Sequence, residues 1–200
     1  MHKELAGIAP VILAGGKSSR MGRNKSFITL GDKKLIDIIA EKVAALFSLP
    51  PLLVTNTPKE YAYLGLPAVS DLYRDMGPLG GIHAALKQWP AKRIFVFGCD
   101  MPFISPELVR HMAALAPGFD VVMPQFGERP EPLHTIYSAA CLAPAEACLA
   151  RGDRRVISFF PQVNVRYLQE TEIRALLPDD TAFININTPE DLERAQELVK

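Results

Sequence analysis

Residues 8–26 have the sequence IAPVILAGGKSSRMGRNKS, in which an apolar run passes directly into a polar, basic segment that contains glycine. The apolar run from Ile8 to Ala14 predicts a buried β-strand, because it is short and is followed by a glycine pair. Residues 15–26 predict a loop. The sequence therefore places a glycine-containing basic loop at the carboxyl end of a core strand.

Strand and helix patterns alternate along the first half of the chain. Strands are predicted at residues 52–54, 67–70, 94–97 and 121–123, and helices at 35–47, after 57–60, from the turn-rich loop at 77–81 to about 88, and from 105. Thr57-Pro58-Lys59-Glu60 has the residues of a capping box with proline at the first helical position. Alternating strands and helices predict parallel pairing with helices on both faces. We therefore expect a three-layer, Rossmann-like α/β fold with a mostly parallel central sheet.

The second half of the chain is less regular. Strands are predicted at residues 133–137, 164–168 and 183–186, and helices at 144–150 and after a second capping box at 188–191. The chain has 200 residues and no internal repeat, so we expect one domain over residues 1–200.

Composition excludes several classes of protein. Lys plus Arg and Asp plus Glu number 22 each, whereas a nucleic-acid-binding protein usually has a basic excess. The three cysteines, Cys99, Cys141 and Cys148, match no metal or redox motif, which favours free thiols in a reducing compartment. No apolar run approaches the length of a membrane span. We therefore expect a cytoplasmic protein that binds neither nucleic acid nor membrane.

The two strongest polar clusters, residues 15–25 and 98–102, each follow an apolar strand directly. In parallel α/β sheets, ligands bind beyond the carboxyl ends of the strands. We therefore expect the two clusters to converge at one edge of the sheet.

The loop at residues 15–25 has the chemistry of a phosphate-binding segment. Glycine lets backbone N–H groups approach phosphate oxygens closely, and the nearby cations, Arg20 and Lys25 above all, would neutralise charge. It is not a P-loop, because Val11 stands where that motif requires glycine, and the G-x-G-x-x-G pattern is absent. On spacing alone, a phosphate-binding loop and a solvated basic turn both remain open.

The segment from Leu13 to Lys25, L-A-G-G-K-S-S-R-M-G-x-x-K, resembles the signature loop of nucleotidyltransferases that act on sugar phosphates and cofactors. Within that group it is most similar to the molybdenum cofactor guanylyltransferases. The glycine pair favours the guanylyl branch, since the cytidylyl enzymes tend to have L-A-A-G there. The resemblance implies nucleotide contacts at Leu13, Ala14, Gly15, Gly16, Gly22 and Lys25.

Asp100 follows the strand at 94–97, and Cys99-Asp100-Met101-Pro102 resembles the C-D-x-P element of this family, whose aspartate binds magnesium. Mg²⁺ prefers carboxylate and phosphate oxygens, so one carboxylate and a triphosphate can hold it. The alternative is that Asp100 only begins a turn before Pro102.

The stretch DLYRDMGPLGG at residues 71–81 resembles the family element D-x-x-x-x-x-G-P-L-x-G. This implies nucleotide contacts from Asp71, Gly77 and Gly81, and a guanine edge, which presents N–H donors, suits a carboxylate. Asn56 lies near a further nucleotide contact of the family, with Thr55 as the alternative. An acidic surface loop before a helix is the competing interpretation.

Three later elements also resemble the family: Glu131-Pro132-Leu133-His134, residues 151–156, and residues 183–192. The resemblance implies that residues 1–115 form a nucleotide-binding half and residues 116–200 an acceptor-binding half. Arg155, Asn185 and Asn187 are the expected acceptor-binding residues. Alternatives are a helix cap for 187–189, a solvated charge pair for Arg154 and Arg155, and a structural role for His134.

The resemblance implies an enzyme that transfers GMP from GTP to the phosphate of molybdopterin with Mg²⁺ and releases pyrophosphate. Transient contacts with other proteins of cofactor synthesis, or with molybdoenzymes, are expected as well. The competing hypotheses are a cytidylyl or sugar-phosphate transferase of the same fold, a non-catalytic nucleotide-binding regulator, and a pure interaction module.

Overall fold

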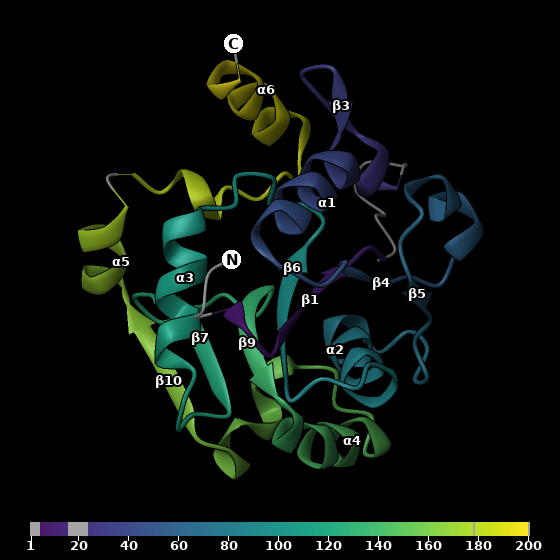
Figure 1. The fold of residues 1–200 in the computed structure, drawn as a ribbon, viewed down its shortest axis with the longest axis vertical. Coiled ribbons are helices and arrows are strands. Elements are labelled where there is room, and N and C mark those ends of the chain that lie inside the picture. The colour runs from purple at the N-terminus through teal and green to yellow at the C-terminus, as the bar shows by residue number, and fades with distance from the viewer. Residues whose placement is uncertain (1–4, 16–23, 178, 200) are drawn as a thin grey trace.

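A β-sheet with helices on both faces forms the centre of the protein in the computed structural model (Figure 1), which describes residues 5–15, 24–177 and 179–199. The strands are β1 (Ile8–Leu13), β2 (Thr29–Leu30), β3 (Lys33–Lys34), β4 (Leu52–Val54), β5 (Ala68–Val69), β6 (Arg93–Gly98), β7 (Val121–Phe126), β8 (Arg129–Pro130), β9 (His134–Ser138) and β10 (Val165–Gln169). The helices are α1 (Leu35–Leu46), α2 (Gly77–Gln88), α3 (Pro106–Leu115), α4 (Leu142–Ala150), α5 (Glu170–Leu176) and α6 (Pro189–Leu198). None of these helices is long and apolar enough to cross a membrane.

The main sheet has the strand order β10-β7-β9-β6-β1-β4-β5, with β8 paired to β7. Along this order, neighbouring strands are parallel except at β9, which runs antiparallel to both β6 and β7. The short strand β8 also runs antiparallel to β7. Only residues 127–133 separate β7 from β9, and a parallel return needs a crossover of a dozen residues or more. The mostly parallel three-layer α/β fold expected from the sequence is confirmed, with β9 as the reversed strand.

Successive residues of the central strands serve opposite faces of the sheet. In β1, Ile8 and Ile12 pack in the core beneath α1 and α3, whereas Val11 and Leu13 pack in the core beneath α2 and α4. Strands covered on both faces need continuous apolar runs, which explains why β1 and β6 lack polar alternation. Cys141 and Cys148 are buried in the second core as free thiols.

An aromatic cluster fills the core at the centre of the sheet. The rings of Phe95 and Phe97 stack with centroids 4.5 Å apart, and Phe47 meets both edge-on. His134 is buried edge-on to the same two rings, and burial lowers the pKa of its imidazole to about 4. His134 is therefore a neutral core residue, and the structural role predicted for it is confirmed.

Two of the local predictions are wrong. Thr57 makes no side-chain cap, because Pro58–Leu64 forms a 3₁₀ helix and the Glu60 carboxylate accepts a hydrogen bond from Asn24 instead. Residues 183–186 do not form a strand, because a 3₁₀ turn at Thr181–Phe183 leads into an extended segment that lies outside the sheet.

The glycine-rich stretch at 77–81 also differs from expectation. It is not a loop before the helix but the first turn of α2, which begins at Gly77 itself with Pro78 in its opening turn. Proline is tolerated there because the first helical N–H groups have no partner within the helix. The capping box at α6 is confirmed, since Thr188 and Asp191 exchange hydrogen bonds between side chain and backbone.

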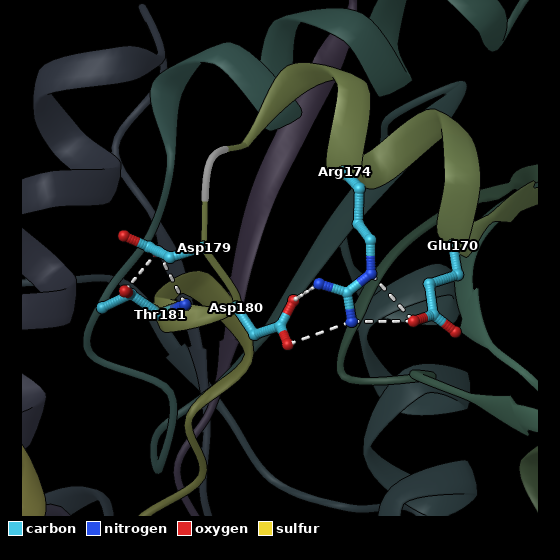
Figure 2. Close-up of polar contacts among 5 residues, drawn as sticks. All are labelled: Glu170, Arg174, Asp179, Asp180 and Thr181. Atoms are coloured by element: carbon cyan, nitrogen blue, oxygen red, sulfur yellow. Dashed lines mark hydrogen bonds and ion pairs between the residues drawn. The ribbon is translucent and has the colours of Figure 1, made fainter.

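Charged side chains link α5 to the segment that leads into the 3₁₀ turn (Figure 2). The Arg174 guanidinium lies 2.7 Å from a Glu170 carboxylate oxygen and 3.2 Å from one of Asp180. Asp179 in turn accepts hydrogen bonds from the Thr181 backbone and hydroxyl. All of these groups are exposed, so the links orient this segment and add little stability.

We expect Phe95→Ala to lower the free energy of unfolding by about 3–5 kcal/mol, because it leaves a cavity where four rings meet. Urea denaturation measures the change. Arg174→Ala is the surface control and should cost less than about 1 kcal/mol. Equal effects of the two substitutions would contradict the placement of the core.

Candidate active site

The carboxyl ends of four parallel strands lie level with one another. Leu13 of β1 is paired in register with Val54 of β4 and with Gly98 of β6, and Val54 is paired with Val69 of β5. Two positions beyond these four residues lie four predicted site residues: Gly15, Asn56, Asp71 and Asp100. The convergence expected from the sequence is therefore present at this edge of the sheet.

Asn56 and Asp71 form a reciprocal pair at the ends of β4 and β5. The Asn56 side-chain N–H donates to Asp71 Oδ2 over 2.8 Å, and the Asp71 backbone N–H donates to Asn56 Oδ1 over 3.1 Å. Burial raises the pKa of the Asp71 carboxyl, and the bond from Asn56 lowers it in part. Thr55, the alternative to Asn56, is buried. The exposed Asn56 side chain is thus the one beside Asp71.

Asp100 lies just beyond the end of β6 in a space that glycine keeps open. A Cβ atom at Gly98 would lie 2.8 Å from Asp100 Oδ1 and 3.2 Å from Leu133 Cβ. Burial raises the pKa of the Asp100 carboxyl, while its own backbone N–H and the charge of Lys25 lower it in part. A positive charge bound beside this half-buried carboxylate would stabilise its ionised form.

Glu131 is a site residue to which the sequence patterns assigned no individual role. Burial and the nearby charge of Asp100 raise the pKa of its carboxyl, while hydrogen bonds from Leu133 N–H and Asn185 lower it. Glu131 reaches Asp100 because β9 runs antiparallel to β6, so that its first residue pairs with Phe97 near the end of β6. Its place in the E-P-L-H element was the only signal in the sequence.

The acidic groups at this edge suit a hard cation that also binds phosphate. Among the described residues, no group of three or more His, Cys, Asp or Glu side chains could hold a metal ion by itself. Asp100, with Glu131 close by, provides oxygen donors of the kind that Mg²⁺ prefers, and Mg²⁺ usually completes its shell with water and phosphate. The residues therefore fit a magnesium ion that is shared with a phosphate ligand.

Lys25 meets Asn187 across the site. The Lys25 Nζ atom donates a hydrogen bond of 2.6 Å to Asn187 Oδ1, which joins residues 162 positions apart. Asn187 was predicted as an acceptor-binding residue, and the structure places it against the predicted phosphate-binding lysine. Asn185, from the same segment, lies beside Glu131.

Polar and aromatic contacts fix the chain on either side of Lys25. The Tyr61 hydroxyl donates to Ser26 Oγ over 3.0 Å and accepts from the Asn24 side chain over 2.9 Å. The Phe27 ring stacks on Tyr61 at 4.9 Å. Tyr61, which no sequence pattern indicated, thus anchors the carboxyl end of the glycine-rich loop.

The predicted glycines have different surroundings. A Cβ atom at Gly81 would lie 3.2 Å from the Leu13 side chain, so glycine lets α2 pack closely on β1, and Gly77 has a positive φ of 63°. At Gly15, no atom of the described residues beyond its chain neighbours lies within 4 Å of the Cβ position. Ala14 is buried, and its N–H bonds to the carbonyl of Val54.

Arg155 is a predicted site residue that the structure does not bring into this cluster. The Arg155 side chain is 78% exposed, and among the described residues it pairs with Asp153, two positions away. Hydrogen bonds from Ser158 and Arg155 lower the pKa of that aspartate to about 2. Gly16, Arg20 and Gly22 lie outside the described residues.

Comparison with known proteins agrees with this geometry. The model of the MobA-like NTP transferase domain matches residues 10–167. The chain is 39% identical to the "Probable molybdenum cofactor guanylyltransferase" of Pelotomaculum thermopropionicum, with 95% of this chain and 92% of that protein covered. It is 37% identical to the molybdenum cofactor guanylyltransferase of Syntrophotalea carbinolica, with 92% and 88% covered.

Solved structures show the same fold. The molybdopterin-guanine dinucleotide biosynthesis protein A of Archaeoglobus fulgidus superposes with a TM-score of 0.84 at 30% identity, covering 96% of this chain and 98% of that one. The 4-diphosphocytidyl-2C-methyl-D-erythritol synthase of Anaerococcus prevotii has a TM-score of 0.72 at 15% identity, with 98% of both chains covered, and shares the fold alone. On the family match and these relatives, the chain belongs to the MobA-like NTP transferase family.

Proposed function

We propose that this protein is a nucleotidyltransferase that transfers GMP from GTP to the phosphate of molybdopterin and releases pyrophosphate. The observation that supports the proposal most directly is the meeting of Lys25, Asp100 and the Asn56–Asp71 pair at one edge of the sheet. The names of the relatives point to the same nucleotide and acceptor.

The reaction needs positioning more than acid–base chemistry. An oxygen of the acceptor phosphate attacks the α-phosphorus of GTP in line; the new O–P bond forms as the bond to the β-phosphate oxygen breaks, and pyrophosphate leaves. The attacking oxygen is already anionic, so no strong general base is required. Catalysis then depends on orientation and on offsetting the charge of the phosphates.

Lys25 is the described residue best placed to bind phosphate oxygens of the triphosphate. Its ammonium group has donors to spare beyond its bond to Asn187. Arg20 and the backbone N–H groups of residues 15–22 are proposed to act with it on the pyrophosphate. Glycine at position 15, which has no Cβ, would let a phosphate approach the backbone.

We propose that Asp100 holds Mg²⁺, with Glu131 in support. When bound, the ion would supply Lewis-acid stabilisation of negative charge on the phosphate oxygens. Burial raises the pKa of both carboxyl groups, and the charge of Asp100 also raises the pKa of Glu131, so a cation between them and the triphosphate would favour their ionised forms.

The Asn56–Asp71 pair is proposed to bind the guanine base. Asn56 holds the Asp71 carboxylate through one oxygen, which leaves the other able to accept hydrogen bonds. Guanine presents N–H donors on its Watson–Crick edge, whereas a carboxylate has no donor to offer the acceptors of cytosine. Asn185 and Arg155 are proposed on the acceptor side. The free thiols fit a reducing compartment, and we propose that the enzyme is cytoplasmic. Transient contacts with other proteins that receive its product are proposed as well.

We expect GTP with Mg²⁺ to stabilise the protein more than CTP, ATP or UTP does. A ligand that binds only the native state adds about 2.7 kcal/mol to stability when its concentration is 100 times Kd. Thermal unfolding with each nucleotide, with and without Mg²⁺, measures the preference. Selective stabilisation by CTP would indicate a cytidylyltransferase instead, and no response to any nucleotide would contradict nucleotide binding.

Asp100→Asn should lower kcat for pyrophosphate release by at least about 100-fold, because the group proposed to hold the metal loses its charge. The fold should remain intact. Burial raises the pKa of Asp100, so its ionised form is disfavoured in the folded protein, and a neutral amide should leave the melting temperature unchanged or higher. An active Asp100→Asn enzyme would exclude the metal role.

Asp71→Asn should weaken GTP binding by about tenfold, because a carboxylate acceptor for the base is lost. In the wild type, affinity should fall as the pH is lowered through the pKa of Asp71, which burial holds above 3.8, and the variant should lack this component. Asp75→Asn is the control from the same loop, since asparagine tolerates its positive φ of 60°. Calorimetric titration of GTP measures all three proteins, and equal affinities would refute the role of Asp71.

A further inference from the structure

The contact between Lys25 and Asn187 is short and involves a charged donor. Its length of 2.6 Å is slightly below the range of about 2.7–2.9 Å for charge-assisted N–H···O hydrogen bonds. Among the described residues, Lys25 forms no ion pair with a carboxylate. Asn187 is thus the partner that sets the direction of the ammonium group.

A neutral amide at this position has a chemical consequence. The Asn187 oxygen accepts one of the three N–H bonds of the ammonium group and leaves the other two for ligand oxygens. Because the amide is neutral, it does not neutralise the positive charge of Lys25, whereas a carboxylate at this position would. The amide therefore orients the lysine and preserves its attraction for phosphate.

Hydrogen bonds fix the backbone of Asn187. The backbone N–H of Asn187 donates to Asp191 Oδ2 over 2.9 Å, and the same oxygen accepts a hydrogen bond from the backbone N–H of Thr188 in the cap of α6. Helix α6 also contacts the β2–β3 hairpin, which follows Lys25 in the chain. The Gln196 side chain accepts a hydrogen bond from the Gly31 backbone N–H and donates one to the Thr29 carbonyl. Asn187 is therefore held through its own backbone and through α6, by contacts that do not involve Lys25.

The residue before Asn187 contacts the other half of the site. Ile186 N–H donates to the carbonyl oxygen of Asp100 over 2.9 Å, and the Ile186 side chain is fully buried against Leu30 and Leu35. Two consecutive residues thus bind the main chain of Asp100 and the side chain of Lys25. This segment sets the distance between the two groups.

We propose that Asn187 is a positioning residue for Lys25: it holds the ammonium group toward the nucleotide triphosphate, and it does so before any acceptor binds. The proposal rests on the proposed nucleotide binding and assigns Asn187 to the nucleotide side. If Asn187 acted only on the acceptor, as expected from the sequence, its replacement would leave nucleotide affinity unchanged when no acceptor is present.

The test is a double-mutant cycle on nucleotide affinity. The dissociation constant is measured by calorimetry for the nucleoside triphosphate that the wild type binds most tightly, with Mg²⁺ and without acceptor. Asn187→Ala and Lys25→Met should each weaken binding by about tenfold, and the double variant should be no weaker than Lys25→Met by more than about twofold.

Asn164→Ala is the matched control. The Asn164 side chain likewise forms a tertiary hydrogen bond, although as a donor, to the backbone carbonyl of Gly118 at 2.9 Å. Asn164 lies before the first residue of β10, at the amino end of that strand. Its replacement should leave nucleotide affinity unchanged. Asn187→Ser, whose hydroxyl is too short to reach Lys25, serves as a second variant if the alanine variant does not fold.

The positioning role would be overturned if Asn187→Ala leaves nucleotide affinity unchanged. It would also be overturned if the double variant loses affinity by the product of the two single losses. Either result would leave the proposed nucleotide binding intact. A wild-type protein that binds no nucleoside triphosphate would refute the proposed function and this role together. Loss of affinity that vanishes in the Lys25→Met background supports the proposal.

Discussion

The register of β1 with its two neighbours is the constraint on which the site depends. Because Leu13 lies level with both Val54 and Gly98, three strands of the parallel sheet end in one line. Each loop that leaves this line carries a predicted site residue two positions beyond the end of its strand. A shift of β1 by one residue would reverse which side chains face each core and would also separate the groups at the sheet edge.

Some of the charged groups at this edge disfavour the ionised forms of their neighbours, which is typical of a ligand-binding site in the free protein. Burial disfavours the ionised forms of Asp100 and Glu131, and the charge of Asp100 further disfavours ionisation of Glu131. Lys25 provides positive charge from the other side without pairing directly with either. Such an arrangement costs stability in the free protein and becomes favourable when a cation and a phosphate bind together.

The sequence was sufficient for the layers of the fold and for the residues that follow strands directly. Apolar runs such as 94–97 identify buried strands, and the position of Asp100 follows from the end of one of them. It was insufficient where position depends on partners far along the chain. The reversal of β9 brings Glu131 to Asp100, and Asn187 meets Lys25, through contacts that no local pattern contains. The errors at Thr57 and at 183–186 have the same origin, because tertiary contacts replaced the expected local ones.

The pairing of Lys25 with Asn187 also bears on how the protein acquires its activity during synthesis. β1 pairs with β6, about 85 residues later, and Lys25 finds its partner 162 residues later, within the last helical cap of the chain. Contacts of such separation form late, because the intervening chain must first be ordered. A ribosome-bound chain that has already formed β1, β4 and β6 would therefore still lack the group that orients its lysine, and the complete site would appear only after residue 187 has emerged and its segment has folded.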